Sequence, residues 1–167
     1  SSAGGHLASA LATIKGYDAK TDDLKISTLP NAMILLYPAF DLVEGWGAGK
    51  KNCIQAGIDP AGFSPALLVS KQTPPTLILS GSKDMCSKSK CNIAFINRMK
   101  KAGRPATFIE YYGQGHRLFL RKKEDPYFQA TIHYMETFLK NNGYLKTVLS
   151  PAVTIKTKVY STESGLE

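Results

Sequence analysis

The most informative stretch of this sequence is its first, Ser1-Ser2-Ala3-Gly4-Gly5-His6-Leu7-Ala8. It matches the later positions of a nucleophile elbow, the Gly-x-Ser-x-Gly turn that presents a reactive serine between a strand and a helix. Ser2 is then the nucleophile and Gly4 the closing glycine, while the first glycine of the pattern would precede Ser1. Small residues must flank such a serine because its backbone is strained and lies close to neighbouring chain. The alternative is a flexible Ser/Gly tail, so the residues downstream must decide.

The segments after this stretch alternate between helical and strand patterns. Residues 5–15 have the spacing of a helix, with Leu7, Leu11 and Ile14 on one face. Three apolar runs, at residues 31–37, 76–80 and 105–112, are typical of strands in a parallel sheet. Helical patterns follow the second and third runs, at residues 88–102 and 125–142, and a glycine ends each. This alternation predicts an α/β fold, a parallel sheet of three strands with helices on its faces.

The end of the chain lacks such a pattern. From Tyr144 onward no period holds in the sequence. We therefore expect residues 1–145 to form the folded α/β part and residues 146–167 to be a C-terminal tail.

Composition narrows the function classes. The chain has 167 residues, which fits one domain, and no apolar stretch long enough to span a bilayer. Its net charge is +8, but the lysines are scattered and no nucleic-acid-binding motif is present, so we expect a solvated basic surface and no nucleic-acid partner. Cys53, Cys86 and Cys91 lack the spacing of a metal site, and neither metal nor cofactor is expected. Cys86 and Cys91 either approach each other or stay free thiols, so the cysteines do not determine the cellular compartment of the protein.

Three residues with catalytic chemistry occur at predicted strand ends. Asp84 follows the second run, His116 follows the third, and Ser2 would follow a strand that ends before Ser1. Because ligands bind at the carboxyl ends of parallel strands, we expect these side chains to converge. The chain order Ser, Asp, His distinguishes this arrangement from the two other known orders of the same triad. Asp41, just after the first run, is the rival for the role of the acid.

The chain resembles the C-terminal half of α/β-hydrolase esterases, in the group of hormone-sensitive-lipase-like and bacterial acetyl esterases. The resemblance runs from residue 1 to about residue 145. It rests on Ser-Ala-Gly-Gly-His at residues 2–6, Tyr-Pro-Ala-Phe-Asp at 37–41, Phe-Ser-Pro at 63–65, Thr-Pro-Pro-Thr-Leu-Ile-Leu-Ser-Gly-Ser-Lys-Asp at 73–84, Tyr-Gly-Gln-Gly-His at 112–116 and Phe-Leu-Lys-Asn-Asn-Gly-Tyr-Leu at 138–145.

The resemblance implies a role for each residue of the expected triad. Ser2 attacks an ester carbonyl, His116 transfers the proton, and Asp84 holds the imidazole. The backbone N–H of Ala3 supplies one donor of the oxyanion hole. Further donors come, in this family, from a His-Gly-Gly loop that the chain does not contain. Asp41, Trp46 and Arg117 are candidate substrate-binding residues; at the position of Arg117 the family usually has glycine or another small residue.

The resemblance covers the last three of the family's eight strands. The run at residues 31–37 would therefore keep an open, apolar edge, which is prone to aggregation. We expect a complementing N-terminal polypeptide or a homo-oligomer to cover it, and we expect the chain alone to be a poor enzyme.

The predicted function is that of a serine esterase acting on short-chain esters, acetyl groups and carbohydrate esters first among them. One alternative is a serine peptidase of the prolyl-oligopeptidase type, which shares the elbow and the triad order. The other is a non-catalytic fragment or degenerate relative that keeps the hydrolase core.

Overall fold

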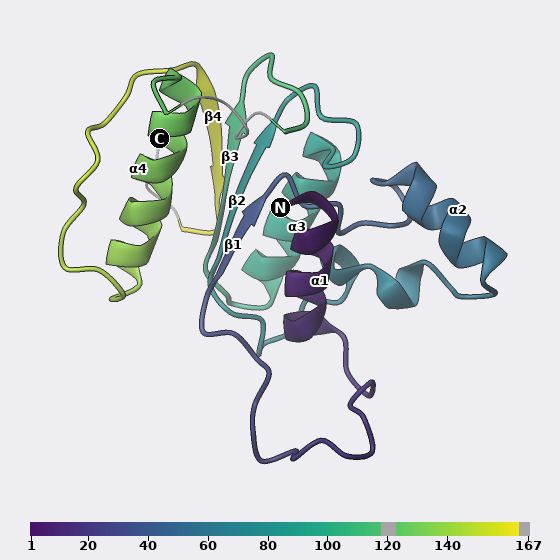
Figure 1. Cartoon of the computed structure of the whole chain (residues 1–167). Helices are drawn as coiled ribbons and strands as arrows, with labels where there is room; N and C mark the ends of the chain where they lie inside the picture. The colour runs from purple at the N-terminus through teal and green to yellow at the C-terminus, as the bar shows by residue number, and fades with distance from the viewer. Residues whose placement is uncertain (118–122, 164–167) are drawn as a thin grey trace.

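The computed structural model describes residues 1–117 and 123–163, and in them a four-stranded sheet carries helices on both faces. The strands lie in chain order: β1 (Met33–Leu36), β2 (Thr76–Gly81), β3 (Ala106–Tyr111) and β4 (Thr157–Ser161). The helices are α1 (Ser2–Thr13), α2 (Gly47–Gln55), α3 (Ser89–Lys101) and α4 (Pro126–Asn141), with short 3-10 turns at Ala61–Phe63 and Pro65–Leu67. Figure 1 shows α1 and α3 against one face of the sheet and α4 against the other.

The predicted α/β architecture is confirmed. β1, β2 and β3 pair in parallel, and their register puts Leu35 opposite Ile78 and Ile78 opposite Phe108. These three side chains belong to one buried cluster, which α1 and α3 complete. The neighbouring strand positions, among them Leu79 and Ile109, face the second cluster under α4. Both faces are thus covered, and this is why the strand runs are apolar throughout rather than alternating.

The segment predicted as a tail contributes a strand to the sheet, which corrects the expectation of three strands. β4 pairs antiparallel with β3, and its Tyr160 ring stacks on Phe108 at 5.4 Å between centroids. Lys158 lies opposite Glu110 in the register, and its Nζ lies 5.0 Å from the centroid of the Tyr160 ring. The sequence concealed β4 because it is short, half-exposed and polar at several positions. The predicted domain boundary at residue 145 stays a prediction.

Helix α1 buries a different face from the one its leucines suggested. Its buried residues are small or hydroxylic: Gly5, Ser9, Ala12 and Thr13. Leu7 and Leu11 are instead 68% and 55% exposed. The outer face of α1, which carries these two leucines, and the segment 14–29 line a hollow of about 900 Å³. The face of α1 that packs closely against the sheet has room for small side chains only, so the leucines lie on the opposite face and point outward.

Within the described ranges, no helix is long and apolar enough to cross a membrane.

Candidate active site

A chain of two hydrogen bonds joins the three residues that the sequence singled out. Ser2 Oγ lies 2.9 Å from His116 Nε2, and His116 Nδ1 lies 2.8 Å from Asp84 Oδ2. Because an ionised carboxylate can only accept, Nδ1 carries the ring proton and Nε2 accepts from the serine hydroxyl. The Asp84 side chain is fully buried, whereas the His116 side chain is 24% exposed. The arrangement can deprotonate Ser2 and hold the resulting imidazolium beside a carboxylate.

Ser2 sits at the start of α1 in a strained backbone conformation. Its φ is +48°, in the left-handed region that residues other than glycine rarely adopt. The Ser2 carbonyl accepts from the Ala39 N–H at 3.1 Å, which ties the turn to the segment after β1. A Cβ at Gly5 would lie 3.0 Å from Pro38 Cβ. The absence of a side chain at Gly5 therefore lets α1 pack closely against Pro38, beside the strained serine.

Asp84 is oriented by the turn that follows β2. Its Oδ1 accepts from the amides of Cys86 and Ser87, each at 2.8 Å. Ser80 Oγ, also buried, donates to Oδ2 at 3.3 Å, beside the bond from His116. Both oxygens of this buried carboxylate are thus satisfied, as a buried charge requires. The sequence had not identified the role of Ser80; its place four residues before the acid, at the end of the strand, was the available signal.

Two hydrogen bonds join the loop of Asp84 to the loop of His116. Lys83 N donates to the Gln114 carbonyl at 2.8 Å, and Gly113 N donates to Ser82 Oγ at 2.8 Å. Tyr37 adds a third constraint, because its ring meets the His116 ring edge-on at 4.7 Å between centroids. The φ of Tyr37 is +38°, so this residue also lies in the left-handed region. The loops that carry acid and base are therefore fixed to each other independently of the Asp84–His116 bond.

Gly81 makes the close approach of these loops possible. A Cβ at Gly81 would lie 2.1 Å from the Gln114 carbonyl oxygen, a contact no side chain tolerates. We expect Gly81→Ala to lower the free energy of unfolding by about 1–3 kcal/mol or more and to shift His116 away from Ser2. Chemical denaturation and labelling of Ser2 with a fluorophosphonate measure the two effects.

Gly47→Ala is the matched control for this substitution. Gly47 opens α2, and a Cβ added to it would meet nothing within 4 Å. We expect no loss of stability there, since alanine is the better helix residue. Equal denaturation midpoints for both variants would contradict the packing argument.

The N–H of Ala3 lies among the first amides of α1, which have no partner inside the helix. The positive end of the helix dipole is at the same place. This amide can therefore stabilise negative charge beside Ser2. Its service as an oxyanion donor stays a prediction.

The three candidate substrate-binding residues lie in different settings. Asp41 is buried, and its Oδ1 accepts from the amides of Val43 and Glu44 at 2.9 and 2.8 Å. The carboxylate therefore orders the loop after β1, and the residue paired with His116 is Asp84 rather than this rival.

Trp46 and Arg117 lie at the two other expected positions. Trp46 is half-buried and caps the start of α2, with its ring so close to Gly49 that a Cβ there would lie 2.6 Å from it. Arg117 is exposed and directly follows His116, with a φ of +63°. This conformation favours glycine, which explains why a small residue is expected at that position. A substrate contact from any of the three stays a prediction.

The cysteines are free thiols, which resolves the alternative left open for Cys86 and Cys91. Burial, with the charge of Asp41 as a smaller cause, raises the pKa of Cys91 to about 12. Burial and the Asp84 carboxylate also raise the pKa of the half-buried Cys86 thiol. The sulfur of Cys86, one nitrogen of His116 and one oxygen of Asp84 all lie within 4.8 Å of one another.

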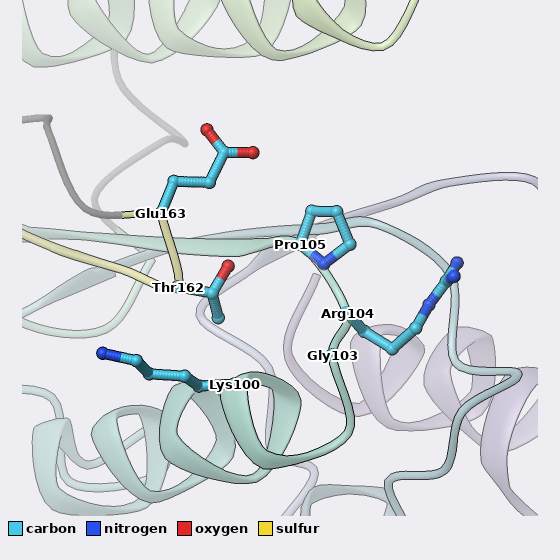
Figure 2. Close-up of a pocket in the computed structure, with 6 residues that line it drawn as sticks. All are labelled: Lys100, Gly103, Arg104, Pro105, Thr162 and Glu163. Carbon is cyan, nitrogen blue, oxygen red and sulfur yellow. The ribbon is translucent and has the colours of Figure 1, made fainter.

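A smaller pocket lies far from the triad. Figure 2 shows its walls, which come from the end of α3, the turn before β3 and the two residues after β4: Lys100, Gly103, Arg104, Pro105, Thr162 and Glu163. It adjoins the N-terminal end of β3, whereas His116 follows the C-terminal end of that strand. The pocket is therefore separate from the candidate site.

Comparison with known proteins gives a structural match. No protein-family model and no curated protein matches the chain. The chain is similar to esterase 2 of Thermogutta terrifontis. The sarin-phosphonylated form aligns with a TM-score of 0.78 at 26% identity, the apo form with 0.76 at 28%, and the propionate-bound form of this thermophilic Planctomycetes esterase with 0.74 at 27%.

The coverage of these alignments is unequal. They include 86–87% of this chain but 54–56% of the esterase chain. The chain therefore spans about half the length of the esterase it resembles.

Proposed function

We propose that this chain carries the nucleophile, base and acid of a serine carboxylic ester hydrolase. The observation that carries the proposal is a pair of hydrogen bonds through the His116 ring. One joins Ser2 Oγ to His116 Nε2, and the other joins His116 Nδ1 to Asp84 Oδ2. A hydroxyl bonded to a neutral imidazole, itself oriented by a buried carboxylate, is the arrangement that activates serine. The similarity to an esterase supports the same chemistry.

The reaction proceeds in two halves. Ser2 Oγ attacks the ester carbonyl while its proton passes to His116 Nε2, and Asp84 stabilises the imidazolium. The tetrahedral intermediate collapses, the alcohol leaves with the proton from Nε2, and an acyl-Ser2 ester remains. Water then gives a proton to Nε2 and attacks the acyl carbon. The second tetrahedral intermediate collapses, Ser2 Oγ takes the proton back from Nε2, and the acid is released. The Ala3 amide stabilises the oxyanion in both halves.

The substrate class follows from the kind of esterase that the chain resembles. Solved forms of the Thermogutta esterase hold propionate and butyrate, both short carboxylates. We propose short-chain acyl esters as substrates, with acetyl groups and carbohydrate esters included, and a place in the hormone-sensitive-lipase-like group. Asp41, Trp46 and Arg117 are proposed to line the surroundings of the alcohol.

The remaining half of the fold is proposed to come from further polypeptide, in the same chain or in a partner. Three features support this. The edge of β1 that faces away from β2 has no strand beside it among the described residues. Leu7 and Leu11 expose an apolar helix face, and Leu24 and Ile26 extend it at 75% and 72% exposure. An apolar surface of this kind is typical of a covered interface.

The substrate test is turnover of p-nitrophenyl acetate, propionate and butyrate by the complete gene product. We expect hydrolysis of all three and none of a proline-containing chromogenic peptide. Cleavage of the peptide at a higher kcat/KM than the esters would favour the prolyl-oligopeptidase alternative instead.

Labelling tests the non-catalytic alternative and the need for further polypeptide together. A fluorophosphonate reacts only with an activated serine, so we expect it to modify Ser2 in the complete gene product. Residues 1–167 alone should label at least about 100-fold more slowly, since loss of one oxyanion donor costs about 100- to 1,000-fold. Equal labelling of both would contradict the need for further polypeptide, and labelling of neither would contradict the proposed hydrolase.

A further inference from the structure

We propose that Asp84, Cys86 and His116 form a site for a thiophilic divalent cation such as Zn²⁺, and that occupation of this site inhibits the triad. The inference rests on the proposed function, because it concerns control of the same serine. The atoms involved are a carboxylate oxygen of Asp84, Cys86 Sγ and a ring nitrogen of His116, mutually within 4.8 Å.

The three donors suit zinc in type and in spacing. Zinc binds thiolate, imidazole and carboxylate at about 2.0–2.3 Å, and a tetrahedral arrangement places such donors about 3.3–3.7 Å apart. The Asp84–His116 pair, now 2.8 Å apart, must open slightly to reach this spacing. The Cys86 sulfur lies within 4.8 Å of both partner atoms. Water fills the fourth position, which the 24% exposure of the His116 side chain makes accessible.

Two of the three proposed ligands, Asp84 and Cys86, belong to the same turn. The Cys86 N–H donates to Asp84 Oδ1 at 2.8 Å, so the two residues share one tight turn. This bond and the one from the Ser87 amide use Oδ1. The oxygen that would face a cation is Oδ2, which accepts from His116 Nδ1 and from Ser80 Oγ. Charge favours the ion as well, because the Asp84 carboxylate and the bound thiolate neutralise a dication. Only one proton is released, from the Cys86 thiol to solvent.

Inhibition follows from the histidine tautomer. A cation on Nδ1 requires that nitrogen to be unprotonated, so the ring proton moves to Nε2. Nε2 then has no lone pair for the Ser2 hydroxyl, which lies 2.9 Å from it in the metal-free structure. The serine loses its base without any displacement of the nucleophile. The Asp84 carboxylate, now a ligand, also ceases to orient the imidazole.

The test uses the complete gene product and two matched cysteine variants. Cys86→Ser removes the proposed sulfur ligand, and Cys53→Ser removes another half-buried free thiol, located on α2. Fluorophosphonate labelling of Ser2 is measured against Zn²⁺ concentration, with EDTA added at the end. Absorption of Co²⁺-loaded protein reports thiolate coordination directly and does not depend on catalysis.

We expect Zn²⁺ to suppress labelling in the wild type and in Cys53→Ser, and EDTA to restore it. Cys86→Ser should need at least about 10-fold more Zn²⁺, since even an indirect partner of a ligand contributes about 10- to 100-fold in affinity. Co²⁺ should give a thiolate charge-transfer band in the wild type and not in Cys86→Ser. Cys86→Ala should repeat the Cys86→Ser result if the serine variant folds poorly.

Equal Zn²⁺ sensitivity of the wild type and Cys86→Ser would overturn the proposal, as would a wild type without the Co²⁺–thiolate band. The failure of the hydrolase proposal is distinguishable from both. In that case Ser2 stays unlabelled without any metal, while the Co²⁺ band of the wild type still appears and still depends on Cys86.

Discussion

Replacement of Ser2 by alanine should lower kcat for ester hydrolysis by about 10⁴- to 10⁶-fold in the complete gene product. The reason is that Ser2, among the three hydrogen-bonded side chains, is the one whose oxygen can form the acyl-enzyme ester. His116→Ala should have an effect of similar size, because the hydroxyl then has no base. Steady-state turnover of p-nitrophenyl acetate measures both, and circular dichroism of each variant verifies that it is folded.

The double variant Ser2→Ala/His116→Ala gives the sharper result. Residues that act as one catalytic unit lose little more together than either loses alone. We therefore expect kcat of the double variant within about tenfold of the lower single variant. Losses that multiply would mean that the two side chains act separately, despite the 2.9 Å contact between them.

The second large effect is expected from Asp84→Asn, about 10⁴-fold in kcat. Asparagine keeps an oxygen for the amides of Cys86 and Ser87, so the turn survives. Its NH₂ group would face His116 Nδ1, which forces the ring proton to Nε2. Nε2 then cannot accept the serine proton. The stability of the variant should change little, and the loss should appear in kcat rather than KM.

Asp41→Asn is the matched control, because Asp41 was the rival for the acid. Its Oδ1 also accepts hydrogen bonds from two loop amides, and the side-chain oxygen of asparagine can accept the same two bonds. We expect its kcat to stay within a few-fold of the wild type. A large loss in Asp41→Asn together with a small loss in Asp84→Asn would reverse the assignment.

The strands could be predicted from the sequence to within one or two residues at most ends. The run at residues 76–80 became β2, Thr76–Gly81, because a strand covered on both faces must be apolar at every position. β4 could not be predicted, since its pairing with β3 depends on a partner about 50 residues away. Its side chains are half-exposed and carry no pattern of their own.

For the candidate site, too, one part could be predicted from the sequence and another part could not. Residue type and chain order were enough to select Ser2, Asp84 and His116, and the structure brings these three into hydrogen-bond contact. Their catalytic role stays a prediction. The sequence left Asp41 as a rival to Asp84, because both carboxylates follow a predicted strand.

What the sequence determined by itself is the local part of this protein: the apolar strands, the glycines and small residues that allow close approach, and the order of the reactive side chains. Tertiary structure decided the relations between distant segments. It paired His116 with Asp84, set the ring of Tyr37 against the imidazole, turned Leu7 and Leu11 outward and put Cys86 beside the base. The physical reason is that periodicity and propensity depend on near neighbours along the chain, whereas side-chain contacts across loops depend on how the strands and helices pack.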